Sequence, residues 1–164
     1  MSLKKILIRK KIRKYARQSG FEETGITGRS ALLIAEEFEE RIPVFLSALK
    51  NAGFNPENLE IFVCNPTKFQ GDHRSLSDSQ VNMRGRFKDE QILESLAKPF
   101  DFLLCFFEEN CYAGGLFTAR AKAQLKIGRG WDALSLFNIS IQTDDFREFW
   151  EEAFKYLKIL KNTN

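Results

Sequence analysis

The sequence predicts an α/β fold, a Rossmann-like three-layer sandwich with a mostly parallel sheet, preceded by a basic amphipathic N-terminal helix. Short apolar runs alternate along the chain with segments of helical periodicity. The length of 164 residues suits a single folded domain. A hydrophobic content of 43% without a long unbroken apolar stretch is typical of a soluble domain. A repeated strand-helix order favours a parallel sheet with right-handed crossovers.

The basic residues are concentrated at the N-terminus. Residues 1–18 contain eight Lys and Arg and no acid, so the rest of the chain has 17 bases and 22 acids. Ile8, Ile12, Tyr15 and Ala16 form one apolar stripe at helical spacing. We therefore predict a basic amphipathic helix over residues 1–20 and a single α/β domain over residues 29–164. The residues expected to contact an anionic surface are Lys4, Lys5, Arg9, Lys10, Lys11, Arg13, Lys14 and Arg17.

Two interpretations of this helix remain open. The apolar stripe docks on the domain and the charges face water, or residues 2–18 contact an anionic membrane surface or nucleic-acid phosphates. Tyr15 is the one aromatic residue of the segment, so stacking on successive bases is disfavoured.

The first half of the domain is predicted to hold a strand-helix-strand unit. Ser30–Ala35 and Leu59–Cys64 are short apolar runs, as expected for strands covered on both faces. Residues 38–49 have helical spacing, with Pro43 in the first turn and Gly53 at the end. Residues 65–86 are polar and exceed the usual length of a structureless loop, so we expect a lid over a site.

The second half continues the alternation of strands and helices. Pro99 should stop a helix, Gly114 and Gly115 should lie near the start of one, and Thr143 with Asp144 and Asp145 should begin the last one. The expected order is a helix over 88–98, a strand over 100–107, a helix ending near 123, a strand over 124–127, a turn at 128–130, a strand over 134–141 and a final helix.

The Cys and His content excludes several chemistries. The single histidine, His73, lies in a polar segment, and the spacing of Cys64, Cys105 and Cys111 matches no zinc finger or ribbon. We expect no metal and no cofactor. Charged residues interrupt the N-terminal apolar run, so we predict no secretory signal and a cytoplasmic chain, with the inner membrane face as the place of any peripheral attachment.

Three segments resemble a bacterial family catalogued only as a domain of unknown function. They are residues 98–104 (KPFDFLL), 121–128 (AKAQLKIG) and 155–160 (KYLKIL). This resemblance implies no catalytic residue. The same order of Phe-Asp, apolar strand, helix and Lys-Ile-Gly is similar to the first Rossmann-like half of heptosyltransferase-type glycosyltransferases, which at the level of the fold implies a small-molecule site of the sugar-nucleotide type.

Ligands of open parallel sheets bind beyond the carboxyl ends of the strands. Polar, acidic and glycine residues follow several predicted strands, and we take them as candidate ligand-binding residues: Glu36, Glu37, Asn65, Glu108, Asn110, Gly128 and Arg129. Acids at a helix start are better explained by the helix dipole, and the glycines around Arg129 by a tight turn. Gly114-Gly115 lacks the surrounding pattern of a phosphate-binding loop.

The sequence therefore predicts a non-enzymatic α/β domain that associates with an anionic surface through its N-terminal helix. Two alternatives stay open. One is a small-molecule site at the strand ends under residues 65–86, and the other is a dimerising scaffold, suggested by the 16 Phe residues.

Overall fold

The computed structural model describes residues 2–18, 27–67, 73–130, 132 and 134–163. One parallel sheet has the strand order β3-β2-β1-β4-β5-β6, so the order reverses between β1 and β4. The predicted α/β class with a parallel sheet is confirmed. The strands are β1 (Ser30–Ala35), β2 (Leu59–Cys64), β3 (Arg74–Leu76), β4 (Phe100–Phe106), β5 (Ala123–Arg129) and β6 (Ile139–Ile141). The helices are α1 (Leu3–Gln18), α2 (Ile42–Asn51), α3 (Glu90–Leu96), α4 (Tyr112–Arg120) and α5 (Phe146–Thr163), with short 3-10 turns η1 (Glu36–Arg41), η2 (Pro56–Asn58) and η3 (Asp78–Gln80).

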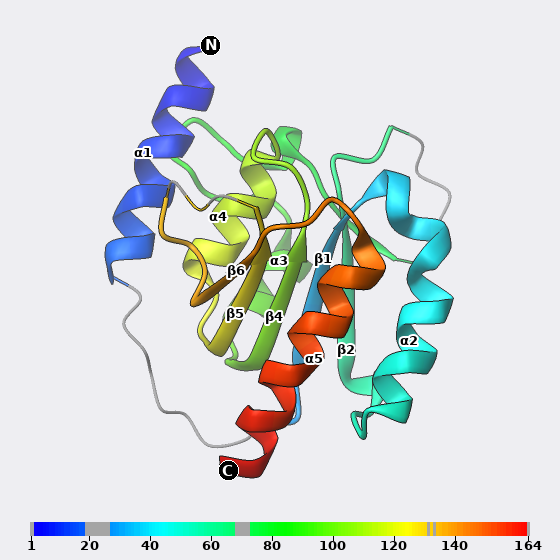
Figure 1. Ribbon diagram of the computed structural model, residues 1–164. Coiled ribbons are helices and arrows are strands. Elements are labelled where there is room, and N and C mark those ends of the chain that lie inside the picture. Colours follow the sequence, from blue (N-terminus) through cyan, green and yellow to red (C-terminus); the bar gives the residue numbers. More distant parts are fainter. Residues whose placement is uncertain (1, 19–26, 68–72, 131, 133, 164) are drawn as a thin grey trace.

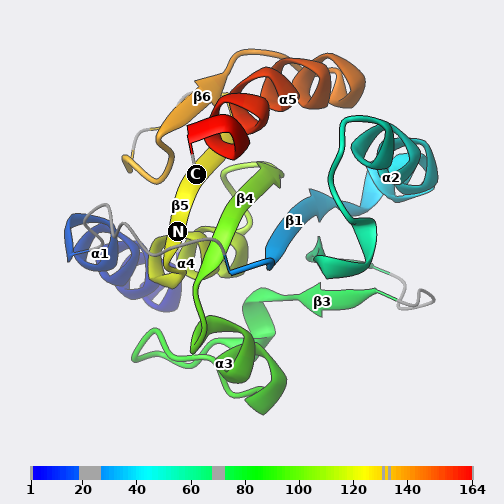
Figure 2. The same cartoon turned by 90° about the horizontal axis from the view of Figure 1, so that it is seen from below.

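Helices cover both faces of the sheet. α2 and α5 lie on one face, and α1, α3 and α4 lie on the other (Figures 1 and 2). Because successive side chains of a strand point to opposite faces, β1 sends Leu33 to the core under α4 and Leu32 to the core under α5. The sheet is therefore the middle layer of three, with a hydrophobic core on each side.

Helix α1 belongs to the core on the α4 side. Ile8 and Ile12 are each 1% exposed, and Tyr15 and Ala16 pack against the same core. The predicted apolar stripe is confirmed as the docked face of the helix. Close approach depends on Gly115 of α4, where an added Cβ would lie 3.2 Å from Cδ1 of Ile12. The predicted domain boundary at residue 29 stays a prediction, since residues 19–26 lie outside the described residues.

The helix predicted to begin just before Pro43 is confirmed, and a separate 3-10 turn precedes it over the first part of the segment with helical spacing. Residues 36–41 form the 3-10 turn η1, and α2 begins at Ile42 with Pro43 in its first turn. Proline has no N–H to donate and clashes with the preceding turn, so a regular helix begins beside it and does not run through it. Gly53 follows the helix with a φ of +95°, as expected for the residue that ends it.

The polar segment over residues 65–86 holds an edge strand that the sequence did not indicate. β3 pairs in parallel with β2, and Leu76 is fully buried. Ser77 and Gln80 then form a capping box on η3. A three-residue edge strand needs only one buried side chain, so it leaves no apolar run to detect. Residues 68–72 of the predicted lid lie outside the described residues, and the lid stays a prediction.

The strand predicted over residues 134–141 is shorter than expected. Only Ile139–Ile141 pairs with β5, because the Asp132 carboxylate accepts hydrogen bonds from the backbone N–H groups of Leu136 and Phe137 at 2.8 and 2.7 Å. The turn predicted at 128–130 is also wrong in extent. Gly128 and Arg129 belong to β5, and the Phe137 ring occupies the space that a Cβ at Gly128 would need.

Replacing Ile12 tests whether α1 is part of the core. Ile12→Ala should lower the free energy of unfolding by about 2–4 kcal/mol, because it leaves a cavity against α4. Ile6 is on the same helix but is 39% exposed, so Ile6→Ala should cost less than about 0.5 kcal/mol. Urea unfolding of both variants measures the difference. Equal effects would mean that the helix is not docked in solution.

Candidate functional site

The predicted strand-end residues occupy the carboxyl edge of the sheet, and three of the seven have side chains that are engaged by local partners. The Glu36 carboxylate accepts hydrogen bonds from the N–H and hydroxyl of Thr67 at 2.8 and 2.9 Å. Glu37 and Glu108 have exposed side chains. Glu36 thus connects the end of β1 to the chain that follows β2, which is a structural role.

Asn65 is tied to Asp78, which the sequence did not single out. Asn65 has a φ of +46°; its side-chain oxygen accepts from the Asp78 N–H at 3.0 Å, and its amide donates to the Asp78 carboxylate at 3.3 Å. The same carboxylate accepts from the Ala113 N–H at 2.8 Å, at the start of α4. Asp78 therefore caps α4 from η3 and occupies the helix end at which Gly114 and Gly115 lie.

Arg129 differs from the other predicted residues because its guanidinium is incompletely satisfied. Its Nη2 donates to Asp144 at 2.9 Å, and its guanidinium lies 4.8 Å from the centre of the Phe106 ring. Nη1 is buried without a hydrogen-bond partner. The side chain is 17% exposed, so this cation is held at the edge between β4 and β5 with one donor unused.

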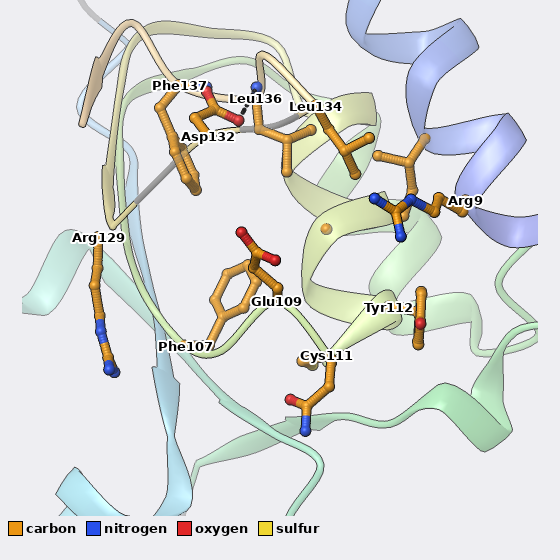
Figure 3. Close-up of a pocket in the computed structure, with 13 residues that line it drawn as sticks. Arg9, Phe107, Glu109, Cys111, Tyr112, Arg129, Asp132, Leu134, Leu136 and Phe137 are labelled. Carbon is orange, nitrogen blue, oxygen red and sulfur yellow. Dashed lines mark hydrogen bonds between the residues drawn. The ribbon is translucent and has the colours of Figure 1, made fainter. Parts of the chain in front are cut away.

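A cavity of about 270 Å³ lies at the carboxyl ends of β4 and β5, and we call it the carboxyl-edge cavity. It brings together two predicted residues, Asn110 and Arg129, with Arg9 of α1. Figure 3 shows the Arg9 guanidinium and the Glu109 carboxylate facing the cavity, whereas the guanidinium of Arg129 points away from Arg9. Nε of Arg9 is buried and has no hydrogen-bond partner. The cavity thus has aromatic and aliphatic walls, and each of the two arginines that line it has one buried guanidinium nitrogen without a hydrogen-bond partner.

Two of the three cysteines are held in the thiol form. Cys64, Cys105 and Cys111 are all buried and free. Burial raises the pKa of Cys105 to about 12 and holds the pKa of Cys64 well above its ordinary value, so both thiols are protonated at neutral pH. Within the described ranges, no group of three or more His, Cys, Asp or Glu side chains is placed to hold a metal ion.

The eight basic residues of α1 divide into two groups. Three are turned toward the protein: Lys4 donates from Nζ to the Asp78 carbonyl at 3.2 Å, Arg9 lines the carboxyl-edge cavity, and the stem of Lys11 lies against Gly85. The other five have exposed side chains: Lys5, Lys10, Arg13, Lys14 and Arg17.

Docking of α1 leaves one side of the helix turned to solvent. At 100° per residue, four of the exposed cations and two apolar residues lie on the side opposite Ile8 and Ile12. The apolar residues are Leu3, 64% exposed, and Ile6, 39% exposed. We call this surface the outward face of α1, and it consists of Leu3, Ile6, Lys10, Arg13, Lys14 and Arg17. No helix in the described part of the chain is long and apolar enough to cross a membrane.

The chain belongs to DUF6913, a family of unknown function, whose profile matches residues 4–160. The family resemblance noted in the sequence is therefore confirmed. Comparisons with curated proteins and with solved structures find no match. The likeness to heptosyltransferase-type glycosyltransferases stays a prediction.

Removing the Asp78 carboxylate should weaken the fold at the start of α4. Asp78→Ala should cost about 1–2 kcal/mol of unfolding free energy, since the Ala113 N–H and the Asn65 amide lose their acceptor. The neighbouring Ser79 is exposed, so Ser79→Ala is the matched control and should change stability by less than about 0.5 kcal/mol. Urea unfolding that gave the same midpoint for both variants would rule out the cap.

Proposed function

We propose that the chain associates peripherally with anionic lipid bilayers through the outward face of α1. The observation that carries this proposal is the placement of four cations and two exposed apolar residues on the side of the helix away from the core. An amphipathic helix with this composition lies in the headgroup region, where its apolar side chains enter the acyl boundary and its cations meet anionic headgroups. Each Lys or Arg near such a surface contributes about 1 kcal/mol.

The same face is less suited to nucleic acid. Tyr15 is half-buried, and the Arg120 guanidinium lies 5.3 Å from the centre of its ring, so it is not presented for stacking on bases. Leu3 and Ile6 would gain nothing from phosphates, whereas transfer of their exposed surface into a bilayer boundary is favourable. These two residues favour a lipid surface over a nucleic-acid backbone.

Vesicle binding by the full chain tests the proposal. Lys10→Gln, Arg13→Gln and Arg17→Gln together should weaken binding to phosphatidylglycerol-containing vesicles roughly 100-fold or more, as expected for three lost contacts. A matched triple variant, Arg41→Gln, Lys50→Gln and Lys158→Gln, removes three exposed cations from the α2 and α5 side and should bind like the wild type. Co-sedimentation with vesicles at low and high salt measures the binding of both triple variants.

Two outcomes would contradict this function. One is an equal loss of vesicle binding in the two triple variants, which would indicate a non-specific charge effect. The other is binding to duplex DNA or RNA that depends on the outward face while vesicles are not bound. Point variants are preferred to deletion of residues 2–18, because deletion would also remove Ile8 and Ile12 from the core.

A second candidate function, small-molecule binding, is favoured by the carboxyl-edge cavity. It lies where ligands of parallel α/β sheets bind, and its aromatic residues Phe107, Tyr112 and Phe137 provide flat apolar walls. The unsatisfied Nε of Arg9 favours a ligand with an anionic group.

A thermal-shift screen of nucleotides and sugar nucleotides tests this second function. A ligand at saturating millimolar concentration should raise the melting temperature, because it binds only the folded state. The shift should disappear in Arg9→Gln and persist in Arg13→Gln, an exposed arginine of the same helix. A ligand that raises the melting temperature of both variants equally would bind outside this cavity. No change in melting temperature with any compound would contradict the second function.

A further inference from the structure

A second cavity lies at the other end of α1, and the residues described along its walls include three bases and no acid. Its volume is about 390 Å³, and its walls come from the end of α1, the end of α4, β5 and the chain before β6. Its basic residues are Arg120, Lys122 and Lys126, and none of the described residues that line it is Asp or Glu. We call it the basic cavity.

Lys126 is the innermost cation of this cavity. The residue is 7% exposed, and its Nζ donates to the Thr118 carbonyl of α4 at 2.7 Å. Its backbone is held on the other side by Asn138, whose side-chain oxygen accepts from the Lys126 N–H at 2.7 Å and whose N–H donates to the Lys126 carbonyl at 2.8 Å. In the described part of the chain, no carboxylate forms an ion pair with Lys126. An ammonium group is thus fixed in a buried position without a counter-charge.

The other two cations of the cavity are Arg120 and Lys122. Arg120 is half-buried with its guanidinium over Tyr15, and Lys122 is exposed two residues further along. Tyr15 and Phe137 supply aromatic walls, and Ser135 and Asn138 supply neutral polar groups. A doubly charged oxyanion in this cavity would meet the buried ammonium of Lys126, and the cavity volume of about 390 Å³ exceeds that of a phosphate ion.

We infer that the basic cavity binds a phosphorylated small molecule, whose phosphate group contacts Lys126, Arg120 and Lys122 while the rest of the molecule lies against Tyr15 and Phe137. Charge-assisted hydrogen bonds to a dianion would supply the counter-charge that Lys126 lacks among the described residues. This site is separate from the outward face of α1, so it holds whether or not the chain binds membranes.

The ionisation of Lys126 gives the site a pH signature. Burial lowers the pKa of Lys126 to about 8, and the nearby Cys105 opposes this shift weakly. The other titratable groups that line the cavity are Arg120, Lys122 and Tyr15, and Cys105 stays protonated because its own pKa is about 12. A bound dianion favours the ammonium form, so affinity should be full below about pH 8 and should fall as the pH rises through that value.

NMR titration of the full chain with inorganic phosphate tests the inference. Amide signals of residues 118–126 should shift saturably at about pH 7, and Arg120→Gln with Lys122→Gln should raise the Kd at least about tenfold. Lys158→Gln, which removes an exposed cation of α5, should leave the Kd unchanged. The absence of saturable shifts at millimolar phosphate, or a double variant with the wild-type Kd, would overturn the site.

Two further arms identify the ligand source and the role of Lys126. Sulfate, which keeps its charge over this pH range, should bind more weakly at about pH 9.5 than at about pH 7. The Lys126→Arg variant should bind sulfate without this pH dependence.

Vesicles containing phosphatidic acid distinguish a lipid headgroup from a soluble ester. Retained vesicle binding by the Arg120 and Lys122 double variant, together with lost phosphate binding, supports a soluble ligand. Lost vesicle binding with unchanged phosphate binding contradicts the site.

Discussion

Burial of Ile8 and Ile12 against α4 is the contact on which the rest of the arrangement depends. These two side chains fix the rotation of α1 about its own axis, and every charge on the helix then has a defined direction. Lys4 reaches the carbonyl of Asp78, Arg9 turns into the carboxyl-edge cavity, and Lys11 lies over Gly85. The remaining cations are left on the side turned to solvent. A basic segment that by composition alone suits many partners thus becomes an oriented surface.

The same helix is a wall of both cavities. Arg9 and Ile12 line the carboxyl-edge cavity, and Tyr15 and Ala16 line the basic cavity near the other end of the helix. Docking of α1 therefore has three consequences at once, because it orients the outward face and closes one side of each cavity. The sequence is basic over residues 1–18 and acidic on balance elsewhere. In the structure, this basic segment is helix α1, which packs on the α4 side of the sheet.

Features set by local pattern could be predicted from the sequence, and features set by distant contacts could not. β1 and β2 coincide with their apolar runs because both are covered on two faces, and the stripe through Ile8 and Ile12 identified the docked side of α1. β3 escaped prediction because Leu76 is its one buried residue. Asp78 could not be recognised as a cap because its partner, Ala113, lies 35 positions away.

Lys126 left a usable signal in the sequence, since a lysine between Leu125 and Ile127 in a strand covered on both faces must point into the protein. The 16 Phe residues, which suggested a dimer, are largely accounted for by the two cores, and the dimer stays a prediction.

We expect α1 to be folded and docked before it meets any partner. Amide hydrogen exchange of the full chain, measured alone and with anionic vesicles, tests this expectation most directly. The α1 amides should exchange slowly in the free protein, and vesicles should change this protection little, because the helix already forms part of a core. Fast exchange of α1 in the free protein, with protection gained only when vesicles are added, would contradict the account and would indicate a helix that folds on the lipid surface.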